Sequence, residues 1–378
     1  MGETVNTTSK GNGWQRLLTT AAMLALLVGC MPAAAGAPDS LTAQQPRRGS
    51  WLKRLVESFS DQDTAYVEPQ HYNWALMLQS VMTYDRYRLS TTGTDRQSMT
   101  FSPQMDIRFG PYFGWRWIFL GYTIDLRSLN VFGRSPKFEL DASIYSARFG
   151  ADVFFRRTVN DYIIRDVNLG AGIDTSPLED VSFDGLKVSI TGVNLYYIFN
   201  YRHFSYPAAF AQSSCQKISC GSWMAGLGYL YNHIDFDYDK LSALVREYLG
   251  PTAKVDSNLN FKTIKYSDIS ASVGYAYNWV FARNWLLCGS LSMALAYKNS
   301  YSEQEGATTE GFDFSNFNID GIGRFGLVWN NTRWYAGASA IFRTYNYHKP
   351  RFATNNIFGD LNVYVGVNFG PRRPYRKK

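Results

Sequence analysis

The chain has few charged residues, few histidines and few cysteines, and long apolar runs are missing after its beginning. Charged residues fill 18% of its 378 positions, against about 25% in a typical globular protein. No apolar run of about 18 residues follows the first forty positions, which argues against a helical membrane protein. The four histidines and four cysteines form no cluster that supplies a full set of metal ligands. We therefore expect no metal and no cofactor.

The formal net charge of +7 does not indicate a nucleic-acid-binding protein. Part of the excess lies in a basic tail at residues 370–378, which holds five Lys and Arg residues. Proteins that bind DNA or RNA carry a basic helix or a patterned basic patch, and neither accompanies this tail. We expect no nucleic-acid partner.

Aromatic residues are abundant, at 16%, and near the C-terminus apolar and polar residues alternate regularly. Between Asp360 and Phe369, apolar side chains at odd positions alternate with polar or small residues at even positions. Successive side chains of a β-strand point to opposite faces, so one face of this segment is apolar and the other polar. A strand of about ten residues with this pattern is the repeating unit of a transmembrane β-barrel.

Period-two patterning recurs in about twelve segments from Tyr72 onward. Short connections, such as residues 282–284, alternate with longer polar ones, such as 85–100 and 158–184. Outer-membrane barrels show the same alternation, because short periplasmic turns follow long external loops. The connection at 200–221 is an exception, since it is long where a periplasmic turn is due.

A strand in lipid cannot leave its backbone polar groups unpaired, and closing the sheet pairs both edges. The sequence therefore predicts an all-β fold over residues 72–369: a closed, antiparallel, up-and-down transmembrane β-barrel of about 12 strands. Both termini would be periplasmic. The expected partners are outer-membrane lipid and, through the C-terminal strand, the barrel-assembly machinery.

One predicted strand changes phase. Leu186, Val188 and Ile190 are apolar at even positions, whereas apolar residues continue at odd positions from Val193. The switch falls at Gly192, where a β-bulge would re-phase the strand.

Residues 1–35 are typical of a secretory signal peptide, with basic residues ahead of an apolar run. Cleavage after Ala35 is favoured, and a lipobox-like run that ends at Cys30 leaves a lipoprotein as the alternative. Residues 36–71 are predicted to form a periplasmic linker with a short amphipathic helix at 51–59.

The polar parity of each strand predicts which charged side chains line the barrel interior. These are Asp106, Arg108, Glu139, Asp141, Arg148, Asp152, Arg156, Lys187, Asp320, Arg324 and Arg343. Because both signs are mixed along neighbouring strands, the first interpretation is a network of ion pairs that fills and stiffens the interior. The second interpretation is a polar path for a small solute. A single dominant sign would have favoured ion selectivity.

Short motifs connect the chain with a known family. The run Asp63–Pro69, followed by Tyr72–Leu78, is one motif, and Phe204–Phe210, which reads Phe-Ser-Tyr-Pro-Ala-Ala-Phe, is another. In these motifs the chain resembles the Gram-negative outer-membrane proteins called domain of unknown function 4421, over residues 61–369. The resemblance implies an outer-membrane barrel and supplies no established activity or catalytic residue.

Cys215 and Cys220 lie close together in an exported segment. A local disulfide between them is the favoured interpretation, with free thiols and a metal site as the alternatives.

Catalysis on lipid would need a Ser–His pair on the lipid-facing wall, where parity places His233. No G-x-S-x-G motif supports such a site, so we expect no enzyme.

The predicted function is that of a porin-like outer-membrane protein of a Gram-negative bacterium, which passes or binds a small-molecule solute or has a structural role in the envelope. The alternative is an outer-membrane lipid hydrolase, phospholipase- or deacylase-like.

Overall fold

The computed structural model describes residues 62–92, 96–105, 107–115, 118–121, 124–125, 138–170, 172–301, 316–348 and 352–375. The chain divides into two units, residues 1–50 and 51–378, and every described residue belongs to the second. The predicted signal peptide, its cleavage site at Ala35 and the helix at 51–59 lie outside the described residues. No helix within the described ranges has the length and apolarity needed to cross a membrane.

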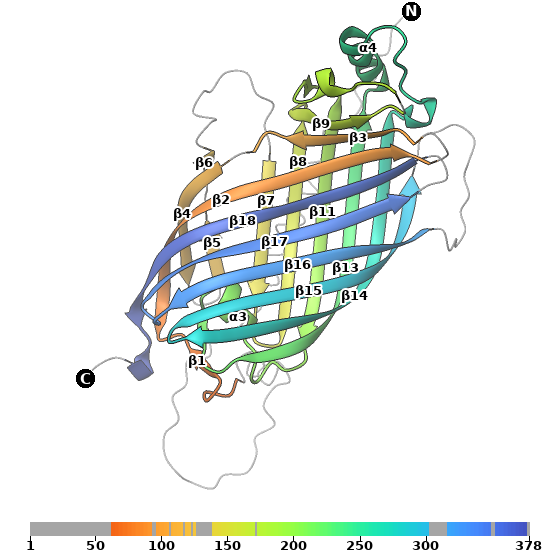
Figure 1. Cartoon of the computed structure of the whole chain (residues 1–378). Helices are drawn as coiled ribbons and strands as arrows, with labels where there is room; N and C mark the ends of the chain where they lie inside the picture. Colours follow the sequence, from red (N-terminus) through yellow and green to blue (C-terminus); the bar gives the residue numbers. More distant parts are fainter. Residues whose placement is uncertain are drawn as a thin grey trace, which may run out of the picture. The chain divides into compact units, whose positions relative to one another are not determined.

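The described residues form one antiparallel sheet of 16 strands and a separate pair of strands (Figure 1). The large sheet contains β2 (Tyr72–Thr91), β3 (Ser98–Pro103), β4 (Ile107–Trp115), β5 (Ile118–Gly121), β6 (Ile124–Asp125), β7 (Phe138–Tyr145), β8 (Phe149–Val159), β9 (Tyr162–Asn168), β10 (Ser182–Phe183), β11 (Leu186–Ile198), β13 (Cys220–Phe236), β14 (Thr263–Ala282), β15 (Trp285–Tyr301), β16 (Phe317–Asn330), β17 (Trp334–His348) and β18 (Phe352–Pro371). The separate pair is β1 (Val67–Pro69) with β12 (Ser214–Gln216). The helical elements are α3 (Tyr206–Phe210), α4 (Tyr238–Leu249) and the 3-10 turns η1 (Ser176–Leu178), η2 (Ser257–Leu259) and η4 (Arg373–Tyr375).

The strands form where the sequence alternates, and the alternation decides which side of the sheet each residue faces. In β18, Val363 is 53% exposed and Val365 is 51% exposed, whereas Tyr364 between them is 6% exposed. The predicted two-faced character of this strand is therefore confirmed. The face with the aliphatic residues is the exposed one, which is the reverse of a water-soluble sheet with a single core.

Strand order follows the chain through most of the sheet. The path runs β7-β8-β11-β13-β14-β15-β16-β17-β18-β2, and the pairing of β18 with β2 joins the C-terminal strand to the first long strand. Among the described residues, no backbone pairing joins β7 to β5 or β6. The predicted all-β, antiparallel fold is thus confirmed as one large sheet, and the predicted closure of that sheet is not seen among the described residues.

The sheet has more strands than predicted because two predicted loops contain paired strands. β2 continues into the expected loop at 85–100 and pairs there with β3. The expected loop at 158–184 holds β9 and β10. Apolar residues of these additional strands, such as Phe101 and Ile164, are fully buried, so apolar packing stabilises strands where the polar composition indicates loops.

The predicted bulge at Gly192 is wrong. β11 keeps an unbroken register with both β8 and β13 through this residue. Leu186, Val188 and Ile190 face inward and are at most 4% exposed, while Leu195 faces outward. The strand does not change phase, because Tyr196 and Ile198 at its other end are also buried. The outer face changes instead: it is polar at Lys187 and Ser189, beside the apolar cap, and apolar at Val193 and Leu195.

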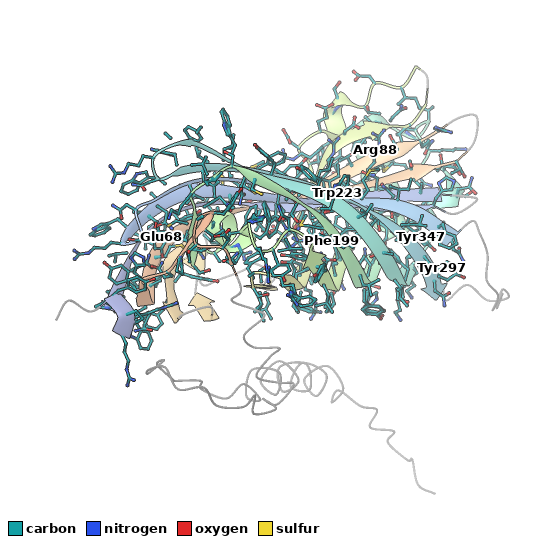
Figure 2. All side chains as sticks on the ribbon, turned by 90° about the horizontal axis from the view of Figure 1, so that it is seen from below. Glu68, Arg88, Phe199, Trp223, Tyr297 and Tyr347 are labelled. Atoms are coloured by element: carbon teal, nitrogen blue, oxygen red, sulfur yellow. The ribbon has the colours of Figure 1, made fainter. Side chains whose placement is uncertain are left out.

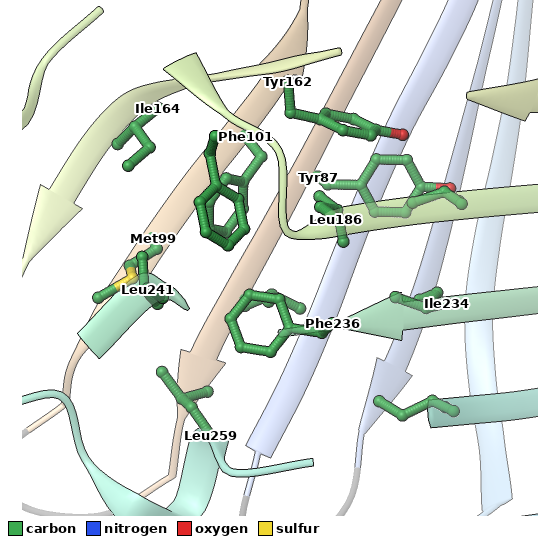
Figure 3. Packing of buried hydrophobic residues seen from close by; sticks show 14 of the residues in the cluster. Tyr87, Met99, Phe101, Tyr162, Ile164, Leu186, Ile234, Phe236, Leu241 and Leu259 are labelled. Atoms are coloured by element: carbon green, nitrogen blue, oxygen red, sulfur yellow. The ribbon is translucent and has the colours of Figure 1, made fainter. Parts of the chain in front are cut away.

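The cap is a cluster of buried residues in which α4, η2 and strands β3, β9 and β10 pack over the ends of β2, β11 and β13 (Figure 3). Leu241 of α4 and Leu259 of η2 are fully buried in it. Gln97 joins its parts: the Gln97 amide donates to the carbonyls of Leu169 at 3.1 Å and Lys254 at 3.0 Å. The cap therefore covers this end of the sheet with apolar side chains.

Candidate functional site

Buried ion pairs connect strands that are far apart in the sheet. The Arg156 guanidinium of β8 lies 2.6 Å from an oxygen of Asp360 on β18 and 3.4 Å from Asp85 on β2. Arg324 of β16 pairs with Asp152 of β8. Neither β18 nor β16 is a neighbour of β8 in the sheet. The sheet therefore curls until the polar faces of its strands meet around a shared interior.

A further buried cation, Lys298 of β15, was not predicted. Its ammonium lies 3.2 Å from Asp320 and 3.9 Å from Asp268, and the side chains of all three residues are at most 3% exposed. Asp360 was also missed. Strand parity alone could have identified Lys298, Asp268 and Asp360, because each shares the buried face of its strand.

A short insertion from the 200–221 connection enters this interior. Ser205 begins α3 and accepts a hydrogen bond from the Ala208 amide, and Pro207 lies in the first turn. Serine at this position and proline just after it are strong helix-start residues. Tyr206 is fully buried, and its hydroxyl donates to Ser290 at 2.9 Å. We call Phe204–Gln212 the plug segment.

The plug segment packs against both ionic and apolar parts of the wall. The Arg324 guanidinium carbon lies 5.9 Å from the centre of the Tyr206 ring, and Ala209 contacts the cluster that contains Cys288. The Gln212 amide donates to the Tyr364 hydroxyl at 2.6 Å. A Cβ added at Gly326 would lie 3.3 Å from the Ala209 carbonyl oxygen, so the wall has a glycine where the plug approaches closely.

A cavity of about 260 Å³ lies beside the plug segment. Its lining residues come from β2, β4, β7, β17, β18 and the plug segment: Met77, Gln79, Val81, Thr83, Arg108, Tyr112, Leu140, Ser143, Tyr145, Phe210, Ala211, Gln212, Ser339, Ile341, Arg343, Asp360, Asn362 and Tyr364. The wall combines aromatic rings with a few amide, hydroxyl and charged groups. Small-molecule sites typically have this mixture.

The structure describes most of the predicted interior residues, and they do not come together in one site. Asp152, Arg156, Asp320 and Arg324 are buried in ion pairs. Arg108 and Arg343 line the cavity. Arg148 lies at the edge of β8, where it donates to the Tyr201 hydroxyl at 2.5 Å. Asp106 and the side chains of Glu139 and Asp141 lie outside the described residues.

The prediction that Lys187 faces the interior is wrong. Lys187 is exposed between the buried residues Leu186 and Val188, so it lies on the outer face of β11. The error follows from the apolar cap, which makes the inner face of this strand end apolar and leaves the polar residues outside.

The predicted disulfide between Cys215 and Cys220 is absent, and both thiols are free. Cys215 belongs to β12, whereas Cys220 begins β13 and its sulfur lies 3.1 Å from the Asn200 amide nitrogen. Each sulfur has its own polar neighbour on a different element. In the part of the chain that the structure describes, no group of three or more His, Cys, Asp or Glu residues could hold a metal ion.

His233 lies on the outer face of β13, with its Nε2 3.1 Å from Asp235 Oδ1. Ser189 of β11 lies directly opposite His233 in the register. Within the described ranges, no serine hydroxyl is hydrogen-bonded to His233.

These features define a large curled antiparallel sheet with an apolar outside, an ionic inside and a short plug segment. The chain belongs to the family described as Domain of unknown function (DUF4421), which matches residues 61–369. The resemblance predicted from the sequence motifs is therefore confirmed. No curated protein matches the chain.

The chain is also similar to solved structures, among them two proteins named as outer-membrane proteins and one transporter. The outer membrane protease OmpT from Escherichia coli has 8% identity and a TM-score of 0.34, over 79% of this chain and 97% of OmpT. The P. putida toluene transporter TodX has 8% identity and a TM-score of 0.23, over 79% and 91%. OprG from Pseudomonas aeruginosa has 8% identity and a TM-score of 0.23, over 80% and 98%. With scores this low, none of their activities transfers to this chain.

Proposed function

We propose that this chain forms a closed β-barrel in the outer membrane of a Gram-negative bacterium and binds a small solute inside without conducting it. The observation that carries the proposal is the polar cavity of about 260 Å³ beside the buried plug segment. A pore needs a continuous water path, whereas here Tyr206 and its neighbours fill the interior next to the cavity.

The outer face supports a membrane location. Leu227 is 65% exposed, Ile269 67% and Leu291 65%, and these residues lie on the neighbouring strands β13, β14 and β15. Phe199 and Trp223 are also exposed and lie close together, with the Phe199 amide donating to the Trp223 carbonyl at 3.1 Å (Figure 2). A continuous apolar face of this size is unfavourable in water and typical of a lipid-facing wall edged with aromatic residues.

Closure is supported by the ion pairs that cross the interior. They already bring β8 close to β18 and β2. Joining the β5–β6 edge to β7 would complete twelve membrane strands: β2, β4, β5 with β6, β7, β8, β11, β13, β14, β15, β16, β17 and β18. In hydrocarbon, pairing these two edges removes unsatisfied backbone groups, each of which costs several kcal/mol.

Planar-bilayer recording tests the proposal. We expect the wild-type protein to be electrically silent. A variant in which residues 203–218 are replaced by a short Asn-Gly turn should conduct, because the replacement removes the plug segment. The control is Lys217→Ala, which changes an exposed residue of the same connection and should stay silent. Stable conductance by the wild-type protein would contradict the proposal, as would recovery of the folded protein from the aqueous periplasm.

A second candidate, an outer-membrane lipid hydrolase, is favoured by the Asp235–His233 contact opposite Ser189. Asp235 would hold His233 so that its free ring nitrogen, as a base, accepts the Ser189 proton. Purified protein in mixed micelles would then release fatty acid from phospholipid, and Ser189→Ala would abolish the release. Absence of any hydrolysis by the wild-type protein would remove this candidate.

A further inference from the structure

Four cations are buried within the described residues: Arg156, Lys298, Arg324 and Arg343. The first three each face at least one buried or nearly buried carboxylate. Arg343 is 3% exposed and makes no ion pair or hydrogen bond with any described residue, and its Nη1 atom has no acceptor. Burying an arginine without a counter-charge is strongly destabilising. Arg343 therefore lacks the partner that the other three have.

The residues around Arg343 hold its guanidinium in place but do not accept hydrogen bonds from its N–H groups. The guanidinium carbon lies 4.8 Å from the centre of the Phe154 ring and 5.9 Å from that of Phe358. Cation–π contacts of this kind fix the plane of the group, while its N–H donors point along that plane. Arg343 also lines the cavity beside the plug segment, so an acceptor bound there can reach it.

We infer that the cavity binds a small carboxylic acid, whose carboxylate pairs with Arg343; this rests on the proposed solute-binding role. The guanidinium fork matches a planar carboxylate through two parallel hydrogen bonds. The cavity volume of about 260 Å³ suits a small molecule.

The remaining lining narrows the ligand class. The charged residues that line the cavity are Arg108, Arg343 and Asp360, and Asp360 already pairs with Arg156. One carboxylate supplies the counter-charge for Arg343, whereas a second anionic group would approach the Asp360 carboxylate. Tyr112 and Tyr145 supply rings for an apolar body. A monocarboxylic acid with a short aliphatic or aromatic body fits this wall.

Calorimetric titration of the full-length mature protein in detergent tests the inference, with sodium acetate, butyrate, benzoate and phosphate as probes in a sulfonate buffer. We expect benzoate or butyrate to bind the wild-type protein at least about tenfold more tightly than phosphate does. Arg343→Gln should weaken that binding by about tenfold or more, because it removes a charge-assisted hydrogen-bonded pair. Arg343→Lys should show an intermediate loss. Arg157→Gln, on the exposed face of β8, is the matched control and should bind like the wild type.

Thermal unfolding of the same proteins shows whether the variants fold. Ligand-free Arg343→Gln should unfold at the same or a higher temperature than the wild type, because an uncompensated buried charge is removed. Benzoate should raise the unfolding temperature of the wild type and of Arg157→Gln only. The inference is overturned if no carboxylate binds, if phosphate binds equally well, or if Arg343→Gln retains full affinity. These outcomes are independent of the bilayer test, since a silent barrel can fail to bind carboxylates.

Discussion

Arg156 and Asp360 are 2.6 Å apart at their nearest atoms, although six strands lie between β8 and β18 in the sheet (β11, β13, β14, β15, β16 and β17). A flat or gently twisted sheet would separate the two residues by several strand spacings of about 4.8 Å each. Their contact therefore requires the sheet to curl, so that β8 and β18 face each other across the interior. It also explains why charges of both signs share the inner face, since Arg156 and Arg324 find their carboxylate partners on strands that are not their neighbours in the sheet.

Asp152→Asn is expected to destabilise the fold by roughly 3–5 kcal/mol, because it leaves the Arg324 charge buried without compensation. Both side chains are 2% exposed, so solvent cannot take over the lost pairing. Urea unfolding in detergent, followed by tryptophan fluorescence, measures the change. The double variant Asp152→Leu, Arg324→Met should regain most of the loss. Equal stability of Asp152→Asn and the wild type would show that the pair is not buried as described.

Ile269→Lys is expected to lower the stability of the protein in lipid vesicles, because a lysine on a lipid face costs up to roughly 2–4 kcal/mol at the bilayer centre and less toward the interfaces. Ile269 is 67% exposed, so the same change on a water-facing surface would be nearly neutral. Urea titration of vesicle-folded protein measures the difference, with Ile269→Met as the control. A neutral effect of the lysine would argue against the membrane location.

Gln97→Ala is expected to loosen the cap. The side chain donates to the Leu169 and Lys254 carbonyls and accepts from the Asp256 amide at 2.8 Å. Each lost bond should cost about 1 kcal/mol. Hydrogen exchange should accelerate in β9 and η2 and stay unchanged in β15. Lys254→Ala is the control, because it keeps the carbonyl that Gln97 uses; similar exchange in both variants would contradict the assignment.

Cys215 is expected to react slowly in the folded protein. Burial and, to a lesser extent, the Glu68 carboxylate raise the pKa of its thiol from 9.0 to about 12. The reactive thiolate is then nearly absent at pH 8. In a variant with Cys220→Ser and Cys288→Ala, iodoacetamide should label Cys215 rapidly in urea and slowly without it. Equal rates would refute the burial of this thiol.

The same shift gives a pH dependence with a definite sign. The folded state favours the protonated Cys215 thiol, so its contribution to stability is complete below pH 9 and is lost as pH rises toward about 12. Replacing Cys215 by alanine should remove this part of the alkaline destabilisation. Urea midpoints at pH 8 and pH 10.5 measure it.

Several features could be predicted from the sequence because they depend on residues that are close along the chain. The alternation in β18 identifies its apolar and polar faces, and the Phe204–Phe210 motif identifies the family. The same local rule misplaced Lys187 and suggested a bulge at Gly192. In both cases the polarity of the outer face changes along β11, while the inner face stays apolar where it packs into a cap formed by segments far away in the sequence.

The sequence by itself determined most of the long strands, their antiparallel order and the side on which most residues lie, because period-two patterning and short turns act between chain neighbours. Only the tertiary structure decided that Arg156 meets Asp360, that Tyr206 fills the interior and that Arg343 faces the cavity with no ion-pair partner among the described residues. Those relations depend on how far the sheet curls and on where the plug segment enters. Curl and entry are set by packing between residues that are hundreds of positions apart, and no local pattern carries that information.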